Sequence, residues 1–117
     1  MHNRKTIIRL LSKVPYQQTS HHIGMKKVLL SDTDTPSHIT QISVITLQKG
    51  EQVEKHVHQT MDEHYLFLSG EGYFMIGGET ISVEDGLFIL VPAGSCHSME
   101  ATGKLTFVTV GVAMDKR

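Results

Sequence analysis

Two histidines one residue apart, His56 and His58, constrain the fold of this chain more than any other feature. Side chains of a β-strand return to the same face every second residue, so both imidazole rings would point the same way, about 7 Å apart along the strand. Converging side chains on a helix would instead need a spacing of three or four residues. The pair therefore predicts a sheet protein in which both rings lean toward one point.

A carboxylate and a third imidazole follow this pair in the sequence. Glu63 comes five residues after His58, and His97 lies in a later segment. Three neutral nitrogens and one carboxylate oxygen suit a borderline transition metal if the fold brings them together. Asp62 is the rival carboxylate, but on a strand it would face away from the side of Glu63. His64 is out of phase in the same way, so we expect it on the outer surface.

Short strand signals recur along the chain, and most of them end at glycine, proline or acidic turn residues. The predicted strands cover residues 25–30, 39–47, 63–68, 73–76, 80–83, 87–91 and 105–112. Residues 6–11 could be a strand or a single helical turn. Regularly spaced short strands without long helices favour an all-β sandwich or barrel.

The composition excludes several classes of partner. A length of 117 residues predicts one domain. A formal net charge of −1 gives no strong electrostatic attraction to nucleic acid or to an anionic membrane surface. No stretch approaches the roughly 20 apolar residues of a membrane span. Cys96 is the only cysteine, so no intrachain disulfide forms, and we expect it as a buried small side chain. These features predict a cytoplasmic protein with no nucleic-acid or membrane partner.

Four other histidines lack a partner at ligand spacing. His2, His21, His22 and His38 lie in polar or N-terminal stretches. We expect them to be tolerated surface residues.

The candidate ligands sit in two segments framed by glycine and proline. The first reads Gly50, five residues, His56-Val57-His58, four residues, Glu63, six residues and Gly70; the second reads Gly86, five residues, Pro92-Ala93-Gly94, two residues and His97. These motifs, joined by the short stretch 71–85, resemble those of the cupin superfamily, in particular its small single-domain cupin_2-like members. The resemblance implies a jelly-roll barrel, or double-stranded β-helix, of about eight strands. It also implies that His56, His58, Glu63 and His97 ligate one divalent metal.

The resemblance further suggests how the chain is organised. Residues 1–117 would form a single cupin domain, with the first metal motif at 50–70 and the second at 86–101. Residues 1–22 would be an extension that a homodimer could exchange as a strand. One departure is visible, because Ala101 stands where the second motif often ends in asparagine. That asparagine is not a ligand in the family pattern, so the expected ligand set is unchanged.

Strand alternation indicates which side chains would line the cavity. If Glu63 and His97 point inward, the residues two and four positions away on the same strand point inward as well. The expected lining comprises Tyr65, Phe67, Met75, Met99 and Phe107. Tyr65 carries the one hydroxyl group of this set and is the candidate catalytic residue.

This set of ligands predicts an open metal site rather than a closed structural one. Three histidines and one glutamate leave one or two positions free on a six-coordinate ion, and they suit Fe, Mn, Ni, Co, Cu or Zn. We therefore predict a small metal-dependent enzyme, with dioxygenase-like chemistry first, acting on a small, partly apolar or metal-chelating molecule. The alternative is a non-catalytic binding or sensing module. The second alternative is a sugar isomerase, an epimerase or a decarboxylase.

The distribution of arginine narrows the range of possible substrate classes. Arginine occurs only at Arg4, Arg9 and Arg117, outside the predicted barrel strands. Bidentate binding of a carboxylate or phosphate usually uses arginine. Phosphosugars and free dicarboxylates are therefore disfavoured as substrates, although a lysine could substitute.

Overall fold

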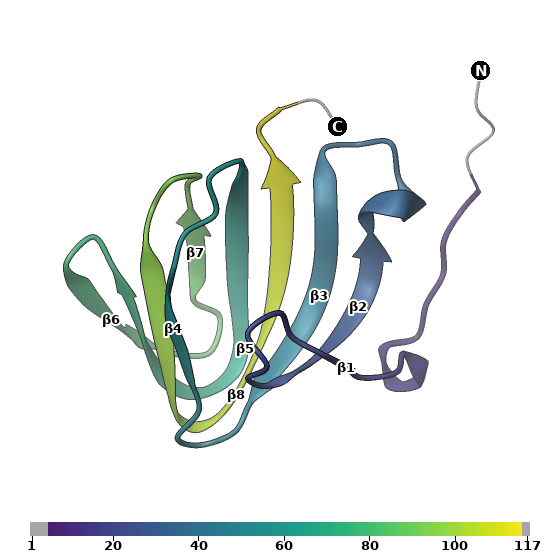
Figure 1. The fold of residues 1–117 in the computed structure, drawn as a ribbon. Coiled ribbons are helices and arrows are strands. Elements are labelled where there is room, and N and C mark those ends of the chain that lie inside the picture. The colour runs from purple at the N-terminus through teal and green to yellow at the C-terminus, as the bar shows by residue number, and fades with distance from the viewer. Residues whose placement is uncertain (1–4, 116–117) are drawn as a thin grey trace.

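The computed structural model describes residues 5–115, and nearly all of their regular structure is β-strand (Figure 1). The strands are β1 Gln17–Gln18, β2 Met25–Ser31, β3 Ile39–Leu47, β4 Gln52–His56, β5 Met61–Ile76, β6 Glu79–Val83, β7 Phe88–Val91 and β8 His97–Ala113. Two single 3-10 turns, η1 Leu11–Lys13 and η2 Asp32–Asp34, complete the elements. Neither is long and apolar enough to cross a membrane, and the described residues contain no other helix. His2 and the first residues of the expected extension lie outside the described residues.

Two long bent strands, β5 and β8, divide one hydrogen-bonded sheet into two facing layers. The first half of β5 pairs with the second half of β8, where Tyr65 lies opposite Thr109. The second half of β5 pairs with the first half of β8, where Phe74 lies opposite Met99. The larger layer is β1-β2-β3-β8-β5-β7, and the smaller layer is β4-β8-β5-β6. This is the eight-stranded jelly-roll arrangement that the resemblance to the cupin superfamily implies.

The bend in β5 lies at Gly70. The pairing register shifts between Phe67 and Ser69 and again between Gly70 and Gly72. Gly70 has φ +117°, and a Cβ there would overlap the carbonyl oxygen of Lys104, so only glycine allows β8 to approach this closely. The sequence predicts separate strands over 63–68 and 73–76. The structure joins them into one strand, because the glycines bend the chain without ending its pairing.

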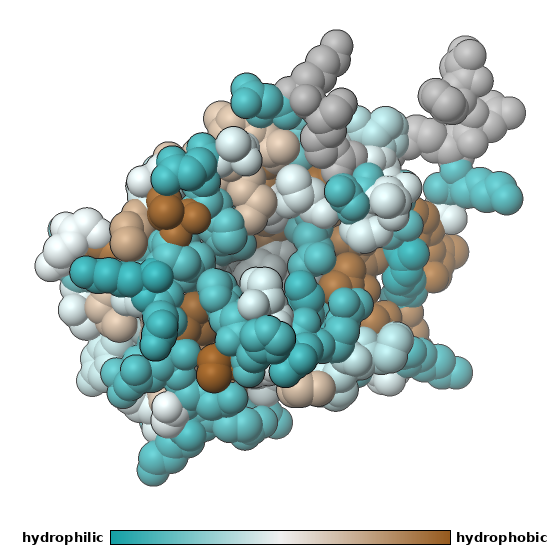
Figure 2. Space-filling model, viewed as in Figure 1, coloured by the Kyte–Doolittle hydropathy of each residue, from teal (hydrophilic) through white to brown (hydrophobic). Residues whose placement is uncertain are grey.

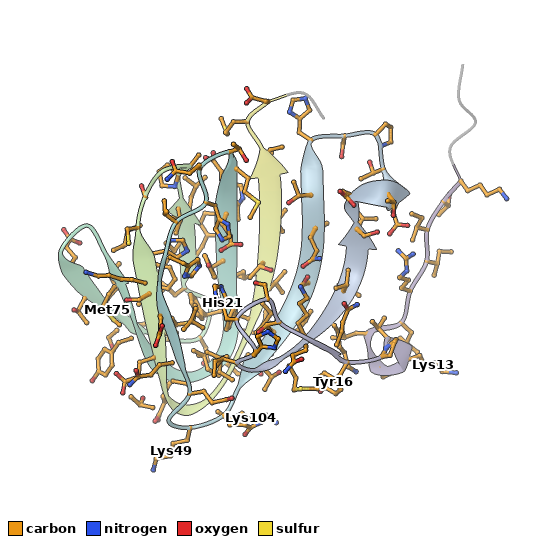
Figure 3. The ribbon with its side chains drawn as sticks, in the orientation of Figure 1. Lys13, Tyr16, His21, Lys49, Met75 and Lys104 are labelled. Carbon is orange, nitrogen blue, oxygen red and sulfur yellow. The ribbon has the colours of Figure 1, made fainter. Side chains whose placement is uncertain are left out.

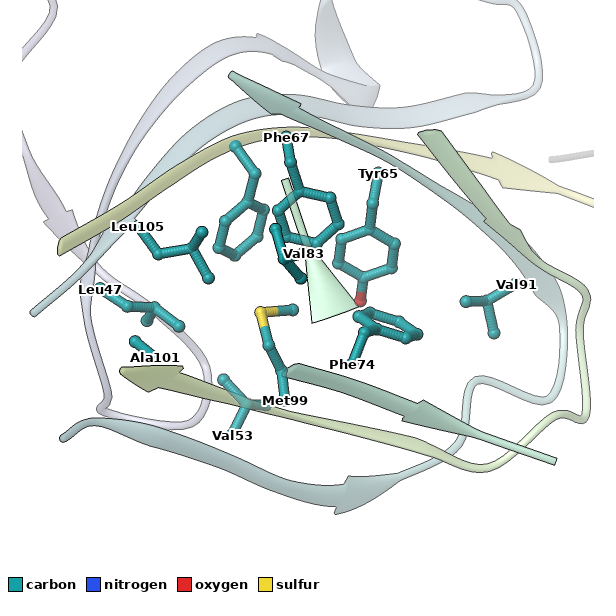
Figure 4. Close-up of a cluster of buried hydrophobic side chains, with 11 residues drawn as sticks. Leu47, Val53, Tyr65, Phe67, Phe74, Val83, Val91, Met99, Ala101 and Leu105 are labelled. Atoms are coloured by element: carbon teal, nitrogen blue, oxygen red, sulfur yellow. The ribbon is translucent and has the colours of Figure 1, made fainter. Parts of the chain in front are cut away.

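The hydrophobic core fills the space between the two layers (Figure 4). Its centre is a cluster of aromatic rings, in which the Phe67 centroid lies 5.3 Å from that of Phe107 and 6.2 Å from that of Phe74. Tyr65 and Phe67 point inward as alternation predicts, whereas Leu66 between them is 40% exposed. Viewed from the side of Figure 1, the surface is mainly hydrophilic, with smaller apolar areas between the polar side chains (Figure 2).

Two sequence expectations need correction. Residues 5–10 form no strand, and the helical turn begins only at Leu11. Cys96 is exposed rather than buried. It lies between β7 and β8 directly before His97, and because the His97 side chain points into the barrel, its neighbour points outward to solvent.

Candidate metal centre

Three strands bring the four predicted ligands together. His56 ends β4 directly opposite His97, the first residue of β8, and their ring centroids lie 4.1 Å apart. His58 follows just beyond β4, with its ring centroid 5.2 Å from that of His56. Glu63 enters from the start of β5. One donor atom from each of the four residues lies within 4.8 Å of all the others, so the cluster could hold a metal ion.

Backbone carbonyls fix the tautomer of two of the rings. The Nδ1 atom of His56 lies 2.9 Å from the carbonyl oxygen of Glu54, and the Nδ1 atom of His97 lies 3.0 Å from that of Ser95. A carbonyl oxygen can only accept, so each Nδ1 carries a hydrogen and Nε2 is the ring atom that faces the cluster; the Nε2 atom of His97 also lies 3.2 Å from the Tyr65 hydroxyl oxygen. This is the arrangement that a metal-binding histidine requires.

Among the described residues, Glu63 is the only carboxylate at the centre of the cluster. Its Oε1 atom lies 3.6 Å from Nε2 of His58 and 3.7 Å from Nε2 of His97, and it accepts a hydrogen bond from the Tyr65 hydroxyl. Burial raises the pKa of Glu63, but the contacts with His97, Tyr65 and His58 outweigh burial and hold this pKa below its usual value. Glu63 is therefore ionised at neutral pH and available as an oxygen donor.

Tyr65 and His56 are both held in their neutral forms. Burial and the negative charge of Glu63 raise the pKa of Tyr65 well above its ordinary value of 10. Tyr65 therefore remains a hydrogen-bond donor and cannot act as a base near neutral pH. Burial lowers the pKa of His56, and repulsion from His97, His21 and His58 adds to this effect, although the bond to Glu54 opposes it.

Asp62, the rival carboxylate, faces away from the cluster as expected and supports the turn before His97. Its Oδ1 atom accepts a hydrogen bond of 2.8 Å from the backbone N–H of Ala93. The next residue, Gly94, has φ +88° and donates its N–H to the carbonyl oxygen of His58 at 2.8 Å. These two bonds tie the turn between β7 and β8 to the segment that carries His58, and so bring the two motifs together.

A cavity of about 170 Å³ opens beside the cluster. Tyr65, Met99 and Phe107 line it, as the sequence predicts. Phe67 is instead fully buried in the core, and Met75 lies in a different depression near Cys96. Figure 3 shows Met75 near β6, away from His21, which lies between β4 and β3.

Sequence reasoning missed the contribution of the N-terminal segment to this cavity. His21 lines the cavity, and its ring centroid lies 4.5 Å from that of His56. The loop carrying it is closed by a bond of 2.6 Å from Thr19 Oγ1 to the carbonyl oxygen of Ile23. Gly24 then donates its N–H to Glu51 Oε2 at 3.3 Å, which attaches the loop to the β3–β4 turn. No spacing in the sequence signals this contact.

Two polar residues of the cavity wall were also missed. Lys26 of β2 and Gln41 of β3 line the same cavity as His56 and Glu63. Alternation does not identify Lys26, because β2 shifts its register between Val28 and Leu30, so that Lys26 and Leu30 lie on opposite faces of the strand.

The comparisons with known proteins agree with this architecture. The family model described as the cupin domain matches residues 43–111. A comparison with curated proteins finds no match. A predicted oxalate decarboxylase from Thermotoga maritima superimposes with a TM-score of 0.84 at 24% identity, over 92% of this chain and 99% of that chain.

Two further solved structures show the same fold. Ectoine synthase from P. lautus has a TM-score of 0.81 at 18% identity, over 92% of this chain and 78% of that chain. An uncharacterised conserved protein with a double-stranded β-helix domain from Klebsiella pneumoniae has a TM-score of 0.72 at 18% identity, over 97% and 95%. Identities this low show the fold alone. Because the family match spans more than half of the residues and includes both histidine motifs, the chain belongs to the cupin family.

Proposed function

We propose that His56, His58, Glu63 and His97 hold one divalent transition metal: Fe, Mn, Ni, Co, Cu or Zn. The observation that carries this proposal is the pair of imidazoles whose Nδ1 atoms bond to backbone carbonyls, so that two Nε2 lone pairs converge with the Glu63 carboxylate. A bound ion of this class would polarise an oxygen of a chelating substrate, and Fe or Mn would also bring oxygen chemistry.

The protein is, on this proposal, a small metal-dependent enzyme with dioxygenase-like chemistry. The apolar walls formed by Met99 and Phe107 exclude water and accept a partly apolar molecule. Tyr65 orients the Glu63 carboxylate through its hydroxyl group, which stays protonated. The residues of this chain therefore bind and orient the substrate beside the metal ligands.

A specific observation supports a non-catalytic binding module as the second candidate. Among the described residues that line the cavity, Glu63 is the only carboxylate, and Tyr65 cannot act as a base. Chemistry that needs a second carboxylate as general base would have to find it outside this set. The same observation counts against a sugar isomerase, an epimerase or a decarboxylase that relies on a second carboxylate.

The metal site is tested by loss of a single ligand. We expect the purified metal-free protein to bind one ion per chain in calorimetric titrations with each of the six metals. His58→Ala should lose most of this metal while circular dichroism still shows a folded β-protein, because His58 lies beyond the end of β4 and outside the core. His38→Ala, at an exposed histidine that contacts the carbonyl oxygen of Ala113, is the matched control. Stoichiometric metal in His58→Ala would contradict the assignment.

A turnover measurement distinguishes the enzyme from the non-catalytic binding module. The metal-loaded protein is supplied with diketones, catechols and thiols while oxygen uptake is recorded. Metal-dependent oxygen consumption supports the dioxygenase-like enzyme. Tight binding of these compounds without any turnover supports the binding module instead.

We also propose that the protein is a cytoplasmic homodimer. A single cysteine, exposed and without a disulfide, suits a reducing compartment. The outer face of the larger layer carries exposed Leu66 and Leu68 on β5 and exposed Phe88 and Leu90 on β7. Apolar side chains gathered on one face favour burial against a second copy.

A further inference from the structure

The cavity has a second polar end, formed by Lys26 and Gln41. The Nζ atom of Lys26 donates a hydrogen bond of 3.1 Å to Oε1 of Gln41. The hydroxyl group of Ser43, a fully buried residue, donates to the same oxygen at 2.8 Å. With its carbonyl oxygen engaged twice, the Gln41 amide presents its N–H₂ group as a further donor.

The charge of this end is not balanced by the protein. An ammonium group has three donors, and Gln41, the partner of Lys26, is neutral. Among the described residues, no carboxylate lies within 4.0 Å of Lys26, since the ion pairs of this part of the chain involve other residues. Lys26 is only partly exposed, and a cation facing a largely apolar cavity is stabilised when a ligand supplies the opposite charge.

The two polar ends lie on different walls of the cavity. Lys26 and Gln41 come from β2 and β3, whereas the histidines and Glu63 lie on or beside β4, β5 and β8. Apolar side chains, including Ile45 and Val53, line the space together with these groups. A ligand that satisfies both ends therefore needs an anionic group and a metal-binding group joined by a short apolar spacer.

We propose that this cavity takes a small carboxylate whose other end chelates the metal, with Lys26 and Gln41 binding the carboxylate. The part of this inference that concerns metal chelation by the ligand rests on the proposed function. A single lysine without an arginine beside it supplies one positive charge, which matches the one negative charge of a carboxylate, whereas a phosphate monoester or a pair of acidic groups carries about two. The ligand class is therefore an oxygen-chelating monocarboxylate.

Matched hydroxamates test this inference. Butanohydroxamate chelates a metal and ends in a methyl group; succinic monohydroxamate has a carboxylate in place of that methyl. Pentanohydroxamate and glutaric monohydroxamate form a second pair with one more methylene. Calorimetry on the metal-loaded protein should show about tenfold or stronger binding of the carboxylate member of at least one pair, as expected for a charge-assisted hydrogen bond.

Two lysine substitutions identify the group responsible. Lys26→Met keeps an unbranched side chain, one atom shorter and without the charge, and should abolish the preference for the carboxylate. Lys27→Met is the matched control, because Lys27 is adjacent on β2 but donates instead to the carbonyl oxygen of Leu11, outside the cavity. It should leave the preference unchanged. The wild-type comparison needs no substitution, so the inference stays falsifiable even if Lys26→Met fails to fold.

The outcomes distinguish this inference from the proposed function. If the metal titration alone shows no binding, both are overturned. If metal binds but the members of each pair bind equally, or none of them binds, the inference is overturned and the metal site stands. A carboxylate preference that persists in Lys26→Met also overturns it.

Discussion

At the scale of single residues, hydrogen bonds to the backbone decide which atoms face the cavity. His56 and His97 each direct Nδ1 to a nearby carbonyl oxygen, which leaves Nε2 pointing toward Glu63 and its neighbours. Asp62, one residue before Glu63, accepts a backbone N–H instead and supports a turn. Successive side chains of a strand point to opposite faces. Glu63 therefore faces the cluster, whereas Asp62 stabilises the turn on the other side.

The lowered pKa of His56 predicts how the stability of the metal-free protein depends on pH. The unfolded chain protonates this histidine near its ordinary pKa of 6.5, whereas the folded chain resists protonation until lower pH. The free energy of unfolding should therefore fall as the pH drops below about 6.5. The lowered pKa of Glu63 adds a further loss below its ordinary value of 4.5. Urea unfolding at a series of pH values measures both effects.

The control for this prediction removes the titrating group. His56→Gln should flatten the first decline and leave the loss at lower pH in place. A wild-type protein that becomes more stable on acidification from about pH 7 to about pH 5 would contradict the predicted sign.

At the scale of elements, the N-terminal segment and the β3–β4 turn act together. The loop between β1 and β2 carries His21 to the cavity, and Glu51 holds it there. Glu51 accepts hydrogen bonds from two backbone N–H groups, that of Gly24 at 3.3 Å and that of Gln48 at 2.6 Å. A carboxylate that bridges two segments sets how firmly the loop closes the cavity.

Removal of that charge should loosen the loop without unfolding the barrel. In Glu51→Gln the amide accepts less strongly than a carboxylate, so hydrogen exchange at residues 19–24 should become faster. Exchange of the amides in β5 and β8 should not change. Glu54→Gln is the matched control, because the Glu54 side chain is exposed and only its carbonyl oxygen contacts His56. Equal exchange at 19–24 in wild type and Glu51→Gln would refute this role.

At the scale of the whole molecule, the outer face of the larger layer forms two cross-strand rows of mainly apolar side chains. One row is Val44, Val108, Leu66 and Phe88, and the other is Ile42, Val110, His64 and Leu90. His64 bonds through Nδ1 to the carbonyl oxygen of Val110 at 3.0 Å, so it lies on this outer face as alternation predicts. Rows of this kind give a flat surface suited to a second copy.

Two acidic substitutions on this face should dissociate the homodimer. We expect light scattering to give twice the mass of one chain for the wild-type protein. The double variant Leu66→Glu, Phe88→Glu should give the mass of one chain, because burying two carboxylates in an apolar interface is unfavourable. Tyr73→Glu is the control, since Tyr73 is 43% exposed on the part of β5 that belongs to the smaller layer. A wild-type protein with the mass of one chain would rule out the dimer.

The sequence by itself determined the class of fold and the four candidate ligands. Strand alternation predicts a common side for His56 and His58 and separates Glu63 from Asp62, whereas His97 and the barrel come from the resemblance to the cupin motifs. The tertiary structure decided which loop closes the cavity and which side chain brings a positive charge to its wall. His21 reaches it because Glu51 anchors a distant loop, and Lys26 faces it because β2 packs beside β3. Such contacts depend on packing between segments far apart in the chain, which local patterns do not encode.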